Sequence, residues 1–175
     1  MAKYRHNLPQ MRGGTFLTDG GMETALIFHQ GIDLPHFATF PLLATEEGRK
    51  ALTAYYEGFL GLARRRGVGF VLDSVTWRAN PDWGAKLGYD RERLRKVNAD
   101  AIRFLEDLRA KWETPATPCV LNGVFGPRGD GYRAGNMDGT ESEDYHSVQM
   151  EVFAGSAADM VSALTMNTVG EALGI

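Results

Sequence analysis

Four short, predominantly apolar segments, each followed by a segment with helical periodicity, constrain the fold of this chain most strongly. The apolar segments cover residues 15–19, 68–73, 119–124 and 159–164. Their shortness and apolar character are typical of parallel strands that are buried on both faces. Strands that alternate with helices predict an α/β domain built on a parallel sheet.

The helical segments are bounded by capping residues. Thr45 precedes a segment with apolar residues at helical spacing, which we expect to end at Arg66 before a glycine cap at Gly67. Asp90 is expected to cap a second long helix that reaches about Trp112. Further helices are expected over 22–29 and 141–157 and from residue 168 onward, whereas residues 34–41 and 74–84 are expected to be loops.

The loops expected after the strands are longer than those expected after the helices. This asymmetry is typical of a (β/α)8 barrel, whose functional loops lie at the carboxyl ends of the strands. We therefore predict that residues 15–175 form the N-terminal half of a (β/α)8 TIM barrel, with four β/α units and truncated before strand five, behind an N-terminal arm over residues 1–14. A doubly wound open sheet is the alternative.

The composition is that of an ordinary globular protein, with 43% hydrophobic and 23% charged residues among 175. The net charge of -3 does not indicate nucleic acid or an anionic membrane as a partner. No apolar run has the length of a membrane span, and no apolar signal core follows the N-terminus, so the expected location is cytoplasmic.

The single cysteine, Cys119, excludes an internal disulfide and a multi-cysteine metal site within this chain. Because it lies in an apolar run, we expect a buried, inert thiol. His146 begins no His-Glu-x-x-His motif, so a solvated or packed histidine is expected there.

The segment Thr15–Thr24 is the clearest candidate for a ligand site. A strand delivers the carboxylate of Asp19 to its carboxyl end, and Gly20 and Gly21 allow a sharp turn with exposed backbone amides. An acid beside such amides suits a zwitterion, because the acid binds an ammonium group and the amides bind a carboxylate. An ordinary Asp-Gly turn is the alternative.

Several motifs in order along the chain resemble the homocysteine S-methyltransferase family. The resemblance covers nearly the whole chain. The motifs are Phe16–Thr24, Thr76–Asn80, Asn122–Gly129, and Ala158–Met160 with Glu171–Ala172.

The resemblance implies a (β/α)8 barrel with a catalytic zinc, which binds the homocysteine thiolate that attacks the methyl group of a sulfonium, ammonium or folate donor. It implies a thiol amino acid and a methyl donor as partners, and methionine biosynthesis as the process. The zinc ligands of the family are three cysteines on strands six and eight, so no metal ligand and no catalytic residue is expected in this chain. The substrate-binding residues implied are Asp19, Gly20, Gly21, Met22, Glu23, Thr76, Trp77 and Asn122.

The chain departs from the family at Leu164, because the family usually places a second acid there to bind the amino group. Loss of that charge should weaken amino-group recognition by about 1.5–3 kcal/mol. Either the substrate is not homocysteine itself, or another residue takes this role.

The aromatic residues near the first two strand ends have two interpretations. They could cage a methylated cation through cation–π contact, or they could close the mouth of the barrel. Arg78 would repel a quaternary ammonium group and suits an anionic donor or substrate better. The aromatic residues concerned are Phe37, Phe40, Trp77 and Trp83.

We therefore expect the complete protein to transfer a methyl group to a thiol, and this chain alone to be inactive. A non-catalytic half-barrel is an alternative, in which two copies could pair as a homodimer over the open sheet edges. Another is a barrel enzyme of different chemistry that uses Asp19, Asp73 or Asp130 as an acid or base.

Overall fold

A computed structural model describes residues 1–175 and contains a single parallel sheet. Its strands are β1 (Phe16–Thr18), β2 (Gly69–Asp73), β3 (Cys119–Phe125) and β4 (Met160–Ala163). They lie in the order β1-β2-β3-β4, and every neighbouring pair is parallel. Sequential order is that of a (β/α) barrel, whereas a doubly wound sheet reverses its order at a switch point. The predicted half-barrel architecture is confirmed.

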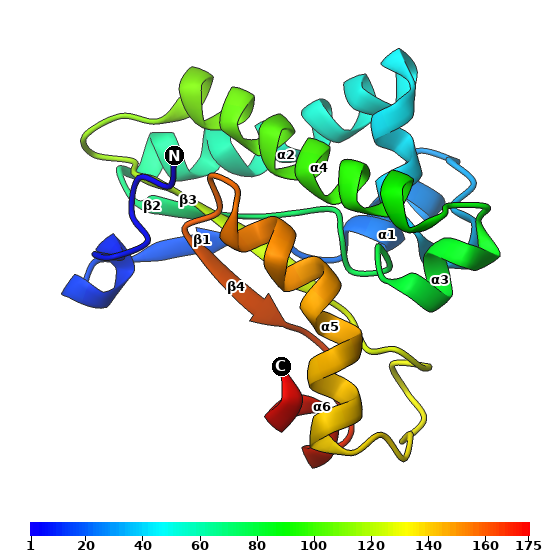
Figure 1. Cartoon of the computed structure of the whole chain (residues 1–175). Helices are drawn as coiled ribbons and strands as arrows, with labels where there is room; N and C mark the ends of the chain where they lie inside the picture. Colours follow the sequence, from blue (N-terminus) through cyan, green and yellow to red (C-terminus); the bar gives the residue numbers. More distant parts are fainter.

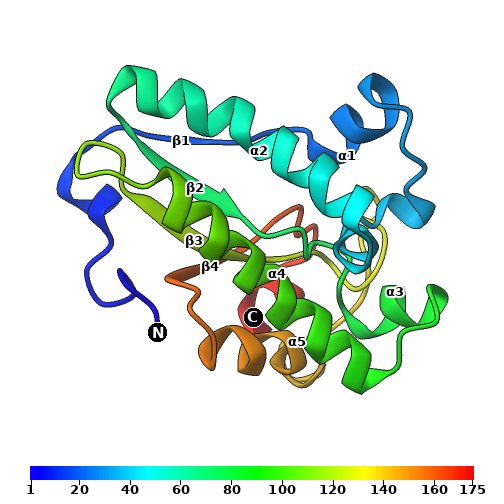
Figure 2. The same cartoon turned by 90° about the horizontal axis from the view of Figure 1, so that it is seen from above.

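The two long helices, α2 (Glu46–Arg66) and α4 (Arg91–Trp112), lie side by side over one face of the sheet (Figures 1 and 2). Helix α5 (Gly139–Ala154) follows β3, and α6 (Val169–Gly174) follows β4. The segment expected as one helix over 22–29 is α1 (Met22–Thr24) followed directly by a π-helical turn, Ala25–His29. No helix has the length and apolar character that a membrane crossing requires.

The predicted helix caps are confirmed. The side chain of Thr45 accepts a hydrogen bond from the Gly48 amide at 3.1 Å, and that of Asp90 accepts one from the Arg93 amide at 2.8 Å. Gly67 has a φ of 62°, the left-handed conformation that a glycine cap provides.

The prediction of a continuous loop over 74–84 is wrong, because the short helix α3 (Pro81–Lys86) begins within it. Asn80 caps this helix by accepting a hydrogen bond from the Trp83 amide at 3.3 Å. Pro81 occupies the first turn, where its missing N–H is not needed. An asparagine followed by proline is thus the start signal of this helix.

The strand register separates a helix-facing layer from an inner layer. Phe70 and Leu72 of β2 and Leu121 of β3 are wholly buried in the core beneath α2 and α4. The residues between them point to the other face. There Asp73 is aligned with Asn122, which donates hydrogen bonds to Asp73 Oδ1 at 2.7 Å and to Ser162 Oγ at 3.0 Å. The inner layer is therefore polar toward its carboxyl end.

Asp159, just before β4, joins the N-terminal arm to the rest of the fold. Its Oδ1 accepts hydrogen bonds from the backbone amides of Lys3 at 2.8 Å and Tyr4 at 2.6 Å. Its Oδ2 accepts one from Arg109 of α4 at 2.8 Å and one from the Leu121 amide of β3 at 3.0 Å. Asp159 is 2% exposed, and its contacts with Arg109 and Leu121 are buried.

We expect the substitution Asp159→Asn to lower the free energy of unfolding by about 3–5 kcal/mol, because it leaves the Arg109 guanidinium buried without its counter-charge. Urea unfolding followed by circular dichroism measures this change. The matched control is Glu151→Gln, which removes the carboxylate of an exposed ion pair with Arg95 and should cost no more than about 1 kcal/mol. Equal effects of the two substitutions would contradict the role assigned to Asp159.

Candidate functional site

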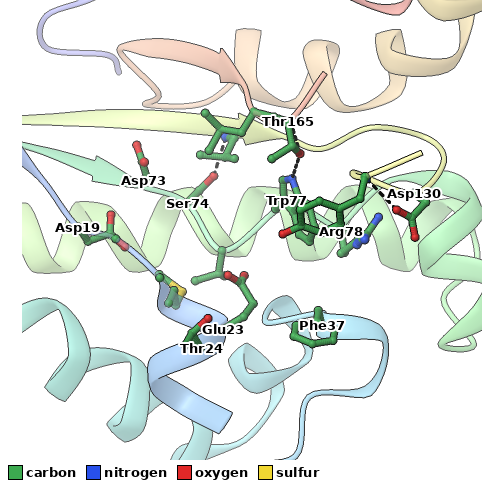
Figure 3. Close-up of a pocket in the computed structure, with 17 residues that line it drawn as sticks. Asp19, Glu23, Thr24, Phe37, Asp73, Ser74, Trp77, Arg78, Asp130 and Thr165 are labelled. Atoms are coloured by element: carbon green, nitrogen blue, oxygen red, sulfur yellow. Dashed lines mark hydrogen bonds between the residues drawn. The ribbon is translucent and has the colours of Figure 1, made fainter. Parts of the chain in front are cut away.

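The carboxyl ends of all four strands surround a cavity of about 620 Å³. This volume is in the range of small-molecule sites, and the position is the one where barrels carry their active sites. Figure 3 shows the lining residues. They come from the segments 19–24, 73–75 and 77–78, from Phe37, Val124, Asp130 and Tyr132, and from Leu164 and Thr165.

Asp19 lines the cavity at the end of β1. Burial raises the pKa of its carboxyl group to about 6, and the charge of Asp73 adds to this effect. Tyr55 opposes the shift by donating a hydrogen bond to Asp19 Oδ2 at 2.8 Å. The other oxygen, Oδ1, has no hydrogen-bond partner. Asp19 is therefore a half-buried carboxylate with one oxygen that has no hydrogen-bond partner in the protein.

The turn after Asp19 has the conformation that its glycines predict. Gly21 has a φ of 65° in the left-handed region and directly precedes α1. Gly20, Gly21, Met22 and Glu23 all line the cavity. Thr39 Oγ1 donates a hydrogen bond to Glu23 Oε1 at 2.8 Å, which fixes this second acid.

Asp73 brings a third carboxylate to the cavity, at the end of β2. Burial raises the pKa of Asp73, and the hydrogen bond from Asn122 opposes this shift. Asp19 and Asp73 thus come from neighbouring strand ends, and the charge of Asp73 raises the pKa of Asp19. Two such carboxylates form a site for a cationic group.

Two of the predicted substrate-binding residues, Thr76 and Asn122, do not line the cavity. Thr76 is wholly buried and donates a hydrogen bond to the Val124 carbonyl at 2.7 Å. Asn122 is 2% exposed and donates its hydrogen bond to Asp73, which lines the cavity. Both residues support the lining, whereas Trp77, the remaining predicted residue, is part of it.

Of the two interpretations of the aromatic residues, the structure does not support a cage of Trp77 and Trp83 around a ligand cation. The guanidinium of Arg78 lies 4.0 Å from the Trp77 ring centroid and 3.8 Å from that of Trp83. The chain's own Arg78 thus lies against one face of each ring, and Lys86 Nζ is also 3.8 Å from the Trp83 centroid. Phe40 is wholly buried and packs against Tyr89, with 5.0 Å between the ring centroids. Phe37 lines the cavity, whereas Phe40 does not.

Ser74, Tyr132 and Thr165 line the cavity although they were not among the predicted substrate-binding residues. Ser74 follows β2 directly, and Thr165 lies two residues after β4, so the strand-end position was the available signal. Thr165 has a φ of 58° and accepts a hydrogen bond from Trp77 Nε1 at 3.0 Å. No sequence pattern predicts that contact, which joins the loops after β2 and β4.

The residues of this chain do not fit a zinc site. No group of three or more histidine, cysteine, aspartate or glutamate side chains is arranged to hold a metal ion. Cys119 begins β3, at the opposite end of the strand from the cavity, and burial raises the pKa of its thiol to about 12. A cysteine binds zinc as a thiolate, which a raised pKa disfavours. Cys119 is therefore the buried, inert thiol that its apolar sequence context predicted. His146 is also packed as expected, with Nε2 3.0 Å from Glu171 Oε1.

At Gly126 the loop after β3 lies close to Trp77 of the loop after β2. A Cβ there would clash with the carbonyl oxygen and the ring of Trp77. We expect Gly126→Ala to lower the free energy of unfolding by about 1–3 kcal/mol, the usual cost of overpacking, and to change the Trp77 fluorescence. Gly129→Ala is the matched control, because nothing lies within 4 Å of its Cβ position. Urea unfolding with tryptophan fluorescence compares the two, and a neutral Gly126→Ala would contradict the close approach.

Asp19→Asn should stabilise the protein at alkaline pH. The folded pKa of Asp19, about 6, lies above its ordinary value of 3.8, so the folded state binds the proton more tightly and its stability falls as the pH rises between these values. Asparagine has no such penalty and can still accept the Tyr55 hydrogen bond. We expect a gain of about 1–3 kcal/mol at pH 8 and none at pH 4, measured by urea unfolding. A gain of equal size at both pH values would contradict the buried charge.

Comparison with known proteins agrees with this geometry. A family model described as homocysteine S-methyltransferase matches residues 16–175. A comparison with curated protein sequences found no match.

Two crystal structures of the homocysteine methyltransferase MmuM from Escherichia coli have a similar fold. The metallated form has a TM-score of 0.70 and 17% identity, and the alignment covers 94% of this chain and 59% of that one. The oxidized form has a TM-score of 0.71 and 18% identity, with 94% and 57% covered. This chain thus spans less than two thirds of the length of either. The family model and the four-strand half-barrel show that the chain belongs to the homocysteine S-methyltransferase family.

Proposed function

We propose that the cavity binds homocysteine or a closely related thiol amino acid, with the substrate ammonium group held by Asp19 and Asp73. The carrying observation is the pair of half-buried carboxylates on neighbouring strand ends, where the pKa of each is raised by burial and that of Asp19 also by the charge of Asp73. An ammonium group placed there would offset both effects and donate to the unpartnered Asp19 Oδ1.

This proposal accounts for the departure at Leu164. Leu164 lines the cavity where the family usually has an acid, so a charge is missing from the end of β4. Asp73 brings a carboxylate to the same cavity from β2. We assign the missing role to Asp73, with Glu23 as a further acid in the lining.

The carboxylate of the amino acid would bind the backbone amides of Gly20, Gly21 and Met22, as the family resemblance implies. The left-handed Gly21 brings this backbone to the cavity beside Asp19. Acid and amides on one turn match the two charges of an amino acid, which are carried by groups on a single carbon. The thiol is then the free end of the ligand.

Methyl transfer to that thiol is our proposal for the whole protein, together with a cytoplasmic role in methionine biosynthesis. The sulfur of the thiolate forms a bond to the methyl carbon of the donor. The bond from that carbon to the sulfur or nitrogen of the donor breaks, and its electron pair leaves with the demethylated donor. In the family, zinc supplies the lowered thiol pKa, but the described residues provide no ligand set for it. We therefore assign substrate binding to these 175 residues, with 15–175 as the barrel part and 1–14 as the arm.

Isothermal titration of the chain with homocysteine under reducing conditions tests the binding site. We expect Asp19→Asn and Asp73→Asn each to weaken binding by about tenfold or more, the worth of a hydrogen bond to a charged group. Asp107→Asn, which neutralises an exposed carboxylate on α4, is the control and should leave the affinity unchanged. Affinity should also fall below pH 6 as Asp19 is protonated. Wild-type affinity in both cavity variants would overturn the proposal.

A separate assay addresses methyl transfer. The purified chain is incubated with zinc, homocysteine and S-methylmethionine, and methionine is measured. We expect no methionine above the background without protein. Turnover by this chain would show that the assignment of substrate binding alone is wrong.

Acid–base chemistry at Asp19 is a second candidate, because a carboxyl pKa of about 6 is suited to proton transfer near neutral pH. The same variant separates the two. A binding role predicts that Asp19→Asn loses homocysteine affinity, whereas a proton-transfer role predicts that the ligand still binds.

A further inference from the structure

Arg78 is a buried cation without a counter-ion. Its side chain lines the cavity, yet the residue is 6% exposed. It forms none of the ion pairs in the structure. Its hydrogen bonding to the protein consists of one bond, from Nη1 to the Gly129 carbonyl at 3.1 Å, and Nε is buried without a partner. A guanidinium has five N–H donors, so most of its donor capacity is unused by the protein.

The guanidinium is held in place by the two aromatic rings on which it lies. Trp77 is fixed in turn by its hydrogen bond to Thr165, and Trp83 belongs to α3, which begins at Pro81. Stacking on two rings limits rotation of the planar group. A ligand therefore meets a pre-oriented fork of donors, which suits the two oxygens of a carboxylate.

The electrostatics of the cavity point to an anion at this position. Burial lowers the pKa of Arg78, and the charges of Asp130 and Glu23 oppose this shift without forming an ion pair. A guanidinium stays protonated in proteins, so the charge persists despite its burial. A buried charge without a partner is costly, and a ligand carboxylate would offset that cost.

Arg78 and the acid pair lie at different ends of the cavity. Figure 3 shows Asp19 and Asp73 toward one end, and Trp77, Arg78 and Asp130 toward the other. The carboxylate of an α-amino acid shares a carbon with its ammonium group. An amino acid bound at Asp19 therefore keeps its own carboxylate at that end and leaves Arg78 to a second ligand.

We propose that Arg78 binds a carboxylate of the methyl donor, which enters the cavity from the end opposite the thiol amino acid. This inference rests on the proposed function for the assignment of the two ligands. It excludes a donor held by stacking of its methylated cation between Trp77 and Trp83, because Arg78 occupies those faces. The donor is anchored by its anionic end, and its methyl-bearing end points toward the thiol.

Binding of a matched pair of sulfonium compounds tests the anion site. The probes are 3-(dimethylsulfonio)propanoate and its methyl ester, which differ in the carboxylate charge. Tryptophan fluorescence reports binding, because Trp77 and Trp83 flank Arg78. We expect the wild-type chain to bind the propanoate at least about tenfold more tightly than the ester, in line with a charged hydrogen bond. Equal affinity, or no binding of the propanoate at millimolar concentration, would overturn the proposal.

The variants Arg78→Gln and Arg78→Lys test whether Arg78 causes the tighter binding of the propanoate. Circular dichroism checks that each variant folds. Arg78→Gln should abolish the preference for the propanoate, and Arg78→Lys should retain part of it. If Arg78→Gln does not fold, two other measurements still test the proposal. They are the affinities of the wild-type chain for the propanoate and its ester, and the smaller difference expected for Arg78→Lys. A preference that survives in a folded Arg78→Gln variant would overturn the assignment to Arg78.

Homocysteine titrations separate this inference from the proposed function. Arg78→Gln should change homocysteine affinity by less than about twofold, because the amino acid binds at the other end. A loss of tenfold or more would place the homocysteine carboxylate at Arg78 and overturn the donor assignment. Failure of homocysteine to bind the wild-type chain, with an Arg78-dependent preference for the propanoate intact, would overturn the proposed function and retain the anion site.

Discussion

The parallel pairing of β1 to β4 in sequence order is the constraint on which the site depends. It brings the carboxyl ends of all four strands to one edge, so that Asp19, Asp73 and Thr165 line one cavity although they are far apart in sequence. At the opposite edge, the buried carboxylate of Asp159 joins the arm, α4 and β3. The amino ends of the strands are therefore fastened by internal contacts, which leaves the carboxyl ends to bind ligands.

The charges in the cavity are unfavourable to the free protein. Burial raises the pKa of Asp19 and Asp73 and lowers that of Arg78, so each charged form is disfavoured by its surroundings. Polar groups that are kept at a cost to stability are common at functional sites. The acids at one end and the guanidinium at the other give the cavity a direction, from a site for cations to a site for anions. That direction underlies both proposals, in which an ammonium group meets the acids and a carboxylate meets Arg78.

Local signals predicted most of the fold and part of the site. Thr45 and Asp90 start their helices as expected, because capping depends on residues three positions away. Helix α3 was missed although Asn80 and Pro81 mark its start. In the site, the turn from Asp19 to Glu23 was predicted as lining because it directly follows a strand. Thr76 and Asn122 were not separable from lining residues, because the sequence does not say whether a side chain forms the cavity wall or lies behind it.

The sequence by itself determined the order of strands and helices, their caps and, through its motifs, the family to which the chain belongs. These features depend on neighbouring residues and on periodicity. The tertiary structure alone decided that Asp73 shares the cavity with Asp19, and that Arg78 lies between Trp77 and Trp83. Both arrangements arise from packing between separate loops. The two tryptophans look the same in the sequence whether a ligand or the chain's own arginine lies against them. Only the folded chain distinguishes a cage for a ligand cation from a site for an anion.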